Sequence, residues 1–184
     1  VVKGKGVENI ENIIGFNFRM GEIEAAIGIE QLKKLPFIIN EKVEIADCLS
    51  SGLSDLPGIQ TPKIGDHCTH VYYAYPITVQ EDLDRNAIYK ALVAEGVPYL
   101  AKAFSLAHLL PMYQQKIAYG KSGYPWKVGK EISDISYNYG ICPIAEGAIE
   151  KTYMNFGIGL VQMDKLKVKK MLDAFNKVWD AYNL

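Results

Sequence analysis

At residues 15–35 the chain reads GFNFRMGEIEAAIGIEQLKKL, and this stretch decides the fold. After Gly21, apolar residues recur at spacings of three and four, which is the period of an amphipathic helix; they are Ile23, Ala26, Ile27, Leu32 and Leu35. Early glutamates suit the positive N-terminal end of such a helix. Pro36 interrupts the pattern, because proline lacks the N–H of the helix ladder and its ring blocks the preceding turn. The pattern resumes at Ile39 and continues to Leu53, so we predict one long bent helix or two abutting helices.

A small sheet is predicted downstream of this helix. The strongest strand is His70–Val79, where β-branched and aromatic residues dominate. Pro76 has no N–H to donate to a ladder, so we predict an edge position or a bulge there. Asp84 is placed to cap a helix over Arg85–Glu95 that ends at Gly96. Shorter strands are predicted over 59–62, 97–101 and 152–157, and a short helix over 143–150.

The C-terminal helix shows one apolar stripe opposite a lysine-rich face, which is typical of a helix packed on a core; the stripe is Leu166, Met171, Leu172, Phe175, Val178, Trp179 and Tyr182. Residues 104–139 are rich in Pro, Gly, Tyr and Lys and exceed the ~12–15 residues usual for a loop, which marks them as functional or mobile. The order of elements predicts an α+β fold: a small antiparallel or mixed sheet covered by helices and preceded by a long helix.

Composition excludes several classes of protein. The 184 residues include 20 Lys plus Arg and 21 Asp plus Glu, a balance that argues against a nucleic-acid partner. Hydrophobic residues make up 49% of the chain, enough for a core. The three cysteines form no C-x-x-C pair, which indicates a reducing, cytoplasmic environment. No apolar run approaches the ~18 residues of a membrane span, so we expect no membrane partner.

Two clusters could carry chemistry. His67, Cys68 and His70 lack a fourth ligand, so a turn before a strand is the simpler interpretation and we expect no metal site. In extended form, Asn17 and Arg19 point to the same side of the chain, just before a helix start. An amide and a guanidinium in that position suit a phosphate or carboxylate. The alternative is that Asn17 is the helix N-cap and Arg19 is solvated.

These residues resemble a known family. The run from Gly15 to Gly28, followed by Gln31-Leu32-Lys33-Lys34-Leu35, is similar to the G-x-N-x-R-M … A-A-x-G … Q-L-x-K-L signature of the DegT/DnrJ/EryC1/StrS aminotransferases. These are pyridoxal-phosphate enzymes of fold type I that make amino sugars and aminocyclitols. The resemblance continues at His70-Val71-Tyr72, Arg85, Gly96 and Cys142-Pro143-Ile144-Ala145-Glu146. Tyr124-Pro125-Trp126 looks most like the branch acting on cyclitols and related keto-sugars.

The resemblance covers the C-terminal part of such an enzyme. The family's Schiff-base lysine, in an S-x-x-x-x-K-x-x-x-x-G-E-G-G type context, has no match here, so no catalytic residue is assigned and the chain alone is expected to be an inactive fragment. The implied organisation is a lead-in from a missing large domain over 1–14, the motif and connecting helix over 15–56, and a small C-terminal domain over 57–184. The face that would pack on the large domain should be an exposed apolar patch.

The resemblance also implies roles for cofactor-binding residues. In a homodimer, Asn17 would contact the pyridoxal 5'-phosphate of the neighbouring subunit through its phosphate. Arg19 would support that phosphate or hold a substrate carboxylate or phosphate, and a structural salt bridge is its alternative role.

Substrate-binding residues follow by the same resemblance. His70 and Tyr72 would border the substrate cleft, with a packed strand position as the alternative. Tyr124 and Trp126, with Tyr137 and Tyr139, would form a lid over a cyclic polyol, and loose surface aromatics are the alternative. Cys142 and Glu146 are expected to set a turn and a helix start instead of touching substrate.

The reaction implied for the parent enzyme is amination of a keto-sugar or keto-cyclitol, with Glu or Gln as the amino donor. Two alternatives stay open. One is a sugar dehydratase of the same family, in which His replaces the Schiff-base lysine at a position outside this sequence. The other is a non-catalytic module for dimerisation or regulation.

Overall fold

The computed structural model describes residues 19–102, 104–118, 121–127, 134–160 and 162–183. The chain divides into two compact units, which we treat separately. The sheet unit comprises residues 20–103 and 148–184, and the loop unit comprises residues 1–19 and 104–147. Asn17 therefore lies outside the described residues.

A four-stranded antiparallel sheet organises the sheet unit, with strand order β1-β2-β4-β3. Its elements in chain order are α1 (Glu22–Leu53), β1 (Ile59–Gln60), β2 (Tyr75–Val79), α2 (Arg85–Ala94), β3 (Leu100–Ala101), a π-helical turn η2 (Ala148–Thr152), β4 (Tyr153–Phe156), a 3-10 turn η3 (Ile158–Leu160) and α6 (Lys165–Tyr182). The fold is α+β, as the sequence predicts. None of the helices in the described ranges has an apolar stretch long enough to cross a membrane.

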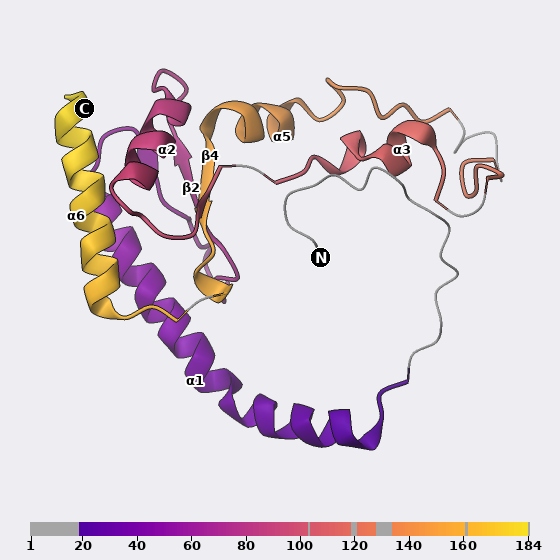
Figure 1. The fold of residues 1–184 in the computed structure, drawn as a ribbon, viewed down its shortest axis with the longest axis horizontal. Helices are drawn as coiled ribbons and strands as arrows, with labels where there is room; N and C mark the ends of the chain where they lie inside the picture. Colours follow the sequence, from indigo (N-terminus) through magenta and orange to yellow (C-terminus); the bar gives the residue numbers. More distant parts are fainter. Residues whose placement is uncertain (1–18, 103, 119–120, 128–133, 161, 184) are drawn as a thin grey trace. The chain divides into compact units, whose positions relative to one another are not determined.

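The core forms where the helices meet the sheet. The C-terminal half of α1 contacts α6, and α6 also contacts α2 (Figure 1). The largest fully buried side chains come from all these elements; they include Leu49, Leu53, Tyr75, Ile77, Phe156, Phe175 and Trp179. The indole N–H of Trp179 donates to the Pro57 carbonyl at 2.8 Å, which satisfies its one polar atom.

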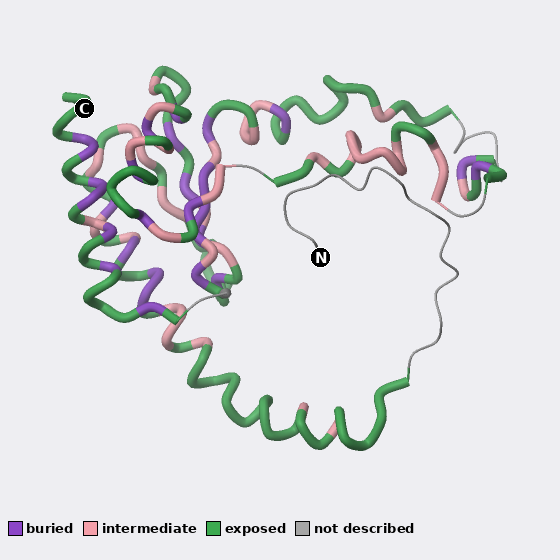
Figure 2. The backbone as a smooth tube through the Cα atoms, viewed as in Figure 1, coloured by how far each residue is buried: buried purple, intermediate pink, exposed green. Residues whose placement is uncertain are grey.

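The long helix α1 is continuous through Pro36 and curves along its length (Figure 1). Only its C-terminal half is buried, as Figure 2 shows. In the N-terminal half, Ile23 is 76% and Leu32 is 66% exposed. Exposed apolar residues are thus present on this half of α1, and their packing on a large domain stays a prediction. A helical period predicts which residues share a face, but it does not say what that face packs against.

The structure corrects several predicted boundaries. β2 begins at Tyr75, five residues later than predicted, because Tyr72 adopts a left-handed backbone (φ 49°) that a strand does not tolerate. β1 pairs only with Thr78 and Val79 of β2 in the described sheet. Pro76 is therefore paired with β4 on one side only, so it lies at a local edge of the sheet, as predicted. In α6, Leu166 and Tyr182 are exposed, while Val168 and Ala174 are buried in their place.

The start of α2 is held by an unusual buried cation. Asp84 caps the helix by accepting the N–H groups of Asn86 and Ala87. Arg85, at the first helical position, is 4% exposed and donates to the carbonyls of Lys102 at 2.6 Å, Tyr153 at 2.8 Å and Ile149 at 3.2 Å, and to that of Glu150. Burial lowers the pKa of its guanidinium, and the charge of Asp84 opposes this shift. Arg85 thus links α2, the end of β3, the turn η2 and the start of β4.

The loop unit contains only short helices in its described part. These are a 3-10 turn η1 (Ala107–Leu109), α3 (Pro111–Gln115) and α5 (Pro143–Gly147). α5 confirms the predicted short helix with Pro at its start, although it ends earlier than predicted and passes into η2.

Candidate functional site

Arg19 lies just ahead of α1 and is exposed. Among the described residues no hydrogen bond or ion pair to Arg19 is present, and the salt bridge to an upstream acid, its alternative role, stays a prediction because the upstream residues lie outside the described ranges. The N-cap of α1 is Gly21, in extended backbone, so the alternative of Asn17 as the helix cap is wrong. An exposed guanidinium beside the positive end of a 32-residue helix is suited to an anionic ligand.

His70 and Tyr72 form a pair in the loop before β2. The Tyr72 N–H donates to His70 Nδ1 at 2.9 Å, and the two ring centroids are 4.3 Å apart. Tyr72 is only 2% exposed and packs toward Tyr75 in the core, so it occupies the packed position given as its alternative. Burial and the nearby Asp47 carboxylate raise the pKa of Tyr72. His70 is exposed and is the member of the pair that a ligand can reach.

An aromatic cluster lies in the loop unit. Trp126 is buried and its indole N–H donates to the Tyr137 hydroxyl at 2.9 Å. Tyr113 completes the cluster, edge-on to Trp126 with ring centroids 6.0 Å apart and tilted against Tyr137 at 5.1 Å. Tyr124 and Tyr139 are about half exposed, at 49% and 59%. Of the four aromatics predicted to form a lid, two are therefore packed and two face solvent.

Polar side chains hold this loop unit together. Glu146 is buried and accepts the Gly140 N–H at 2.8 Å and 2.9 Å and the Cys142 N–H at 3.3 Å. His108 Nε2 lies 2.7 Å from the same carboxylate. Burial alone would raise the pKa of Glu146, but these hydrogen bonds and the charge of His108 together lower it. The expectation that Glu146 sets a turn and a helix start is confirmed.

A second tie crosses the loop unit. The Gln114 amide donates to the His108 carbonyl at 2.7 Å and to the Tyr137 carbonyl at 2.6 Å. Together with the Trp126–Tyr137 hydrogen bond, this connects the His108–Glu146 pair to the aromatic cluster. The sequence reasoning did not identify His108, Gln114 or Tyr113, because no local pattern marks a contact that forms only across a long loop.

A cavity of about 340 Å³ adjoins the aromatic cluster. It is lined by Gln115, Lys116, Ile117, Lys121, Gly123, Trp126 and Lys127. The lining contains three lysines and no carboxylate among the described residues, so a positive potential is expected inside it.

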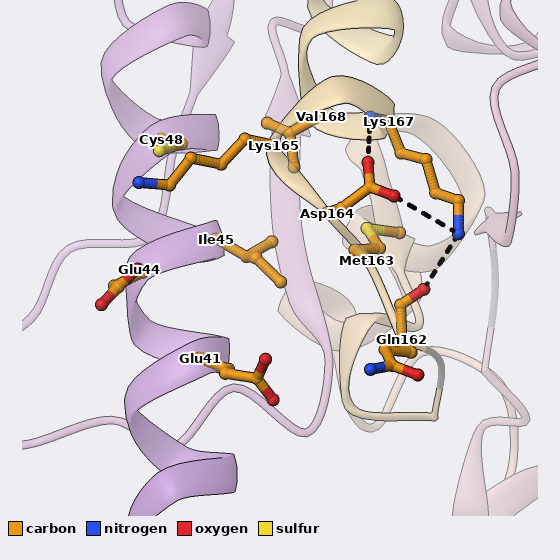
Figure 3. A pocket seen from close by; sticks show the side chains of 10 residues that line it. All are labelled: Glu41, Glu44, Ile45, Cys48, Gln162, Met163, Asp164, Lys165, Lys167 and Val168. Carbon is orange, nitrogen blue, oxygen red and sulfur yellow. Dashed lines mark hydrogen bonds and ion pairs between the residues drawn. The ribbon is translucent and has the colours of Figure 1, made fainter.

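A larger cavity of about 450 Å³ lies in the sheet unit between α1 and the start of α6 (Figure 3). Its charges largely compensate one another: Asp164 accepts the Lys167 backbone N–H at 2.8 Å, and the Lys167 ammonium lies 3.9 Å from the same carboxylate. None of the residues predicted to bind cofactor or substrate lines it. The described residues also contain no group of three His, Cys, Asp or Glu placed to hold a metal ion.

The predicted site residues thus fall on both units. His70 and Tyr72 belong to the sheet unit, whereas Arg19, Tyr124 and Trp126 belong to the loop unit. A signal for the loop-unit cavity is present in the sequence: residues 116–130 carry four lysines and no acidic residue.

Known proteins share both sequence and fold with this chain. GDP-perosamine synthase of Escherichia coli O157:H7 is 30% identical over 118 residues, which cover 62% of this chain and 32% of that protein. Among solved structures, DesV of S. venezuelae has a TM-score of 0.64 at 21% identity, covering 86% of this chain and 36% of that one. Helicobacter pylori PseC has a TM-score of 0.61 at 20% identity, covering 98% and 43%. At these identities the structures show a shared fold.

The chain spans about a third of the length of the curated relatives that it matches. The family model of the DegT/DnrJ/EryC1/StrS aminotransferase family matches residues 2–130, which is more than half of the chain and includes the GFNFRM stretch. Sequence motif, family model and fold agree, and the chain belongs to the DegT/DnrJ/EryC1/StrS aminotransferase family.

Proposed function

We propose that this chain is the C-terminal part of a cytoplasmic, pyridoxal-phosphate-dependent aminotransferase that aminates a keto-sugar carried on a nucleoside diphosphate. The observation that carries the proposal is the G-x-N-x-R motif at residues 15–19, inside the segment that matches the family model. Relatives of this chain are named as a GDP-perosamine synthase, a UDP-linked altrosamine transaminase and a dTDP-linked trideoxyglucose 4-aminotransferase. Those names favour a nucleotide-linked sugar over a free cyclitol.

The described residues fit an anionic cofactor. Arg19 presents an exposed guanidinium without a partner among the described residues, next to the N-terminus of α1. In the proposal, Asn17 and Arg19 bind the cofactor phosphate of the neighbouring subunit in a homodimer, the amide donating a hydrogen bond and the guanidinium adding charge. When bound, pyridoxal phosphate accepts an amino group from a donor such as Glu or Gln and passes it to the keto group.

The substrate contacts are assigned to the accessible residues of the predicted set. His70 and Tyr124 are exposed and can contact a sugar directly. Trp126 is buried and reaches ligand only through the cavity that it lines, where its ring offers an apolar wall. We assign Tyr72 a packing role, because its ring is covered by the core.

The lysine that anchors the cofactor is supplied, in this proposal, by a preceding large domain. No lysine of this chain lies in the S-x-x-x-x-K-x-x-x-x-G-E-G-G type context. The 184-residue chain alone is therefore expected to give no amino transfer.

The test uses the polypeptide of the whole reading frame that contains this chain, with glutamate and a UDP-, GDP- or dTDP-linked 4-keto-sugar as substrates. We expect formation of 2-oxoglutarate and of an amino sugar identified by mass spectrometry. Asn17→Ala and Arg19→Ala should each weaken cofactor affinity by about tenfold, the loss of one charge-assisted contact. Lys34→Ala, on the exposed part of α1, is the matched control and should leave affinity unchanged.

Other outcomes select the alternatives. A sugar product that has lost a hydroxyl group without gaining an amine would identify the dehydratase. Absence of any turnover together with a stable dimer would identify the non-catalytic module. Amino transfer by the 184-residue chain alone would show that the anchoring lysine has been misassigned.

A further inference from the structure

We propose that a cavity of the sheet unit, between the α2–β3 connection and α6, binds a small aromatic carboxylic acid. The cavity, which we call the Tyr99 cavity, has a volume of about 360 Å³, within the range of small-molecule sites. Residues 95–99 line one side and residues from the start of α6 line the other. None of the described residues assigned above to cofactor or substrate lines it, so the inference does not depend on the proposed function.

The floor of the Tyr99 cavity is apolar. Val97, Met163 and Met171 are 6%, 7% and 2% exposed, and all three belong to the core of the sheet unit. Pro98 continues this apolar lining. Methionine has a polarisable thioether and a flexible side chain, so it adapts to an irregular ligand and makes favourable contacts between its sulfur and aromatic rings. The floor therefore suits an apolar, planar body.

The wall that carries Val97 is fixed by the end of α2. Gly96 has a left-handed backbone (φ 84°) and its N–H donates to the Val93 carbonyl at 3.0 Å, while the Val97 N–H donates to the Leu92 carbonyl at 3.0 Å. This pair of hydrogen bonds is a Schellman motif, in which the residue after the glycine packs back on the helix. The carbonyls of Leu92 and Val93 are thus satisfied within the chain, and the wall forms without a ligand.

Tyr99 has a backbone conformation that packing in the sheet unit does not explain. Its φ of 55° lies in the left-handed region, which a bulky side chain adopts only at a cost, yet 61% of the residue is exposed. The Tyr99 carbonyl accepts the Gly157 N–H at 3.2 Å, so a contact with the chain after β4 holds the residue in place. Strain of this kind concentrates at ligand sites. The exposed Tyr99 ring is therefore available to stack on an aromatic ligand.

The charge of the lining is complementary to one carboxylate. Glu95 is paired with Lys177 at 2.7 Å, and the Lys167 ammonium lies 3.9 Å from the Asp164 carboxylate (Figure 3). Lys170 has no hydrogen-bond or ion-pair partner among the described residues. One uncompensated cation beside an apolar floor matches a monocarboxylate, whereas a phosphate or diphosphate would bring more negative charge than the lining neutralises.

The cation and part of the apolar floor come from the same face of α6. Lys167, Lys170 and Met171 are spaced by three and four residues, so their side chains are neighbours on the helix surface. A lysine stem covers apolar surface while its ammonium stays in water. A ligand whose ring lies on the floor and whose carboxylate faces solvent therefore meets the apolar contacts and the cation together.

The test is an NMR titration of the isotope-labelled 184-residue chain with 3-phenylpropionate at low salt. We expect a Kd of about 0.1–1 mM, as for a ligand of about ten non-hydrogen atoms. The amide signals that shift should be those of the cavity lining, such as Gly96, Val97 and Met171. The uncharged 3-phenylpropanamide and the non-aromatic 3-cyclohexylpropionate should each bind about threefold more weakly. Equal binding of all three compounds, or no saturable shift at these amides, would overturn the proposal.

Glutamate and pyridoxamine 5'-phosphate separate this site from the proposed reaction. Both are anions of that reaction, and neither places an apolar ring with a single carboxylate in the cavity. We expect neither to shift the amides of the lining at the concentrations that saturate with 3-phenylpropionate. Tighter binding of either compound at the Tyr99 cavity would overturn the proposal, because the cavity would then serve the donor or the cofactor.

Lys170→Met tests the cation, because it removes the charge and keeps most of the stem. It should weaken 3-phenylpropionate binding about three- to fivefold, as for one exposed charged contact, and leave binding of 3-phenylpropanamide unchanged. Lys169→Met is the matched control: the residue is exposed on the same helix, lies outside the lining, and its loss should change affinity less than about 1.5-fold. Equal losses for the two variants, or equal losses for the acid and the amide, would overturn the proposal.

Tyr99→Asn tests the ring, because asparagine tolerates the left-handed backbone at this position. The variant should weaken 3-phenylpropionate binding severalfold without lowering the midpoint of urea unfolding, since the ring is mainly exposed. Unchanged affinity would overturn the proposal. These titrations use neither cofactor nor turnover, so their failure leaves the proposed function untouched, and absence of amino transfer by the full polypeptide leaves the Tyr99 cavity untouched.

Discussion

Replacing Arg85 with methionine removes a buried side chain that links α2 to the end of β3, to the turn η2 and to the start of β4. The guanidinium is 4% exposed and donates to the carbonyls of Lys102, Tyr153, Ile149 and Glu150. Methionine has a similar length and no donor. The variant therefore keeps most of the packing and deletes the hydrogen bonds.

The magnitude follows from two opposing effects. A hydrogen bond to a charged group contributes about 1.5–3 kcal/mol, and four carbonyls lose such a donor. Removing a buried cation also returns its desolvation cost, and the Nε atom of Arg85 is buried without a partner among the described residues, so part of that cost is uncompensated. We expect a net loss of about 3–4 kcal/mol in the free energy of unfolding of the sheet unit. Arg85→Lys keeps the charge but not the planar fork and should lose about 2 kcal/mol.

Urea unfolding with tryptophan fluorescence measures this change, because the chain has two tryptophans and each unit contains one. In a Trp126→Phe background, Trp179, which is 1% exposed in the core, reports on the sheet unit alone. The midpoint should fall at an unchanged m-value. Lys90→Met, on the exposed face of α2, should stay within about 0.5 kcal/mol. If Arg85→Met lost less than about 1 kcal/mol, the four carbonyl contacts would not stabilise the sheet unit as argued.

Three further outcomes are expected. Because the pKa of Glu146 is lowered in the folded state, ionised Glu146 stabilises the loop unit above its ordinary pKa of 4.5, and this stability is lost as pH falls through the lower folded-state pKa. Hydrogen exchange should then show that the Gly140 N–H loses its protection in that pH range. Glu146→Gln should remove this pH dependence. Burial raises the pKa of Tyr75 to about 12. The stability that the protonated Tyr75 hydroxyl contributes to folding is therefore complete below pH 10 and is lost as pH rises toward 12. Tyr75→Phe should remove one tyrosine's share of the phenolate absorbance change in that window and, by deleting the hydrogen bond to Ser50, cost about 1 kcal/mol. Leu32→Glu should reduce self-association of the chain in sedimentation velocity, because it places a charge within the exposed apolar patch.

Local signals in the sequence predicted the elements of the sheet unit well. The cap at Asp84, the stop at Gly96 and the strand around Ile77 each depend on residues within a few positions, and all are present in the structure. The predicted strand from His70 was too long because composition favours a strand there, whereas the left-handed backbone at Tyr72 ends the ladder. Propensity indicates where a strand forms and is a weaker guide to its ends.

Contacts between distant segments were not predictable in the same way. Arg85 was recognised only as a helix start, yet its partners lie 17 to 68 residues away. His108 contacts Glu146 at a sequence separation of 38 residues, and Gln114 contacts Tyr137 at a separation of 23. A polar residue in a loop gives no sign of its partner, because a hydrogen bond has no sequence period. The loop unit, whose order depends on such contacts, was therefore the part of the candidate site that the sequence described least.

The two halves of α1 show what an amphipathic pattern does and does not determine. Both halves carry apolar residues at helical spacing, but Leu49 is 1% exposed and Leu32 is 66% exposed. The C-terminal half packs on α6, which this chain provides. For the N-terminal half the described residues provide no covering surface (Figure 2). A helix in water does not gain stability from an uncovered apolar face, since most helical stability in proteins comes from packing. The family relation offers an explanation for the exposed half of α1. The relatives are about three times as long as this chain, and the G-x-N-x-R motif begins just ahead of the exposed turns of α1. A surface that covers these turns would supply the packing that the N-terminal half of α1 lacks among the described residues.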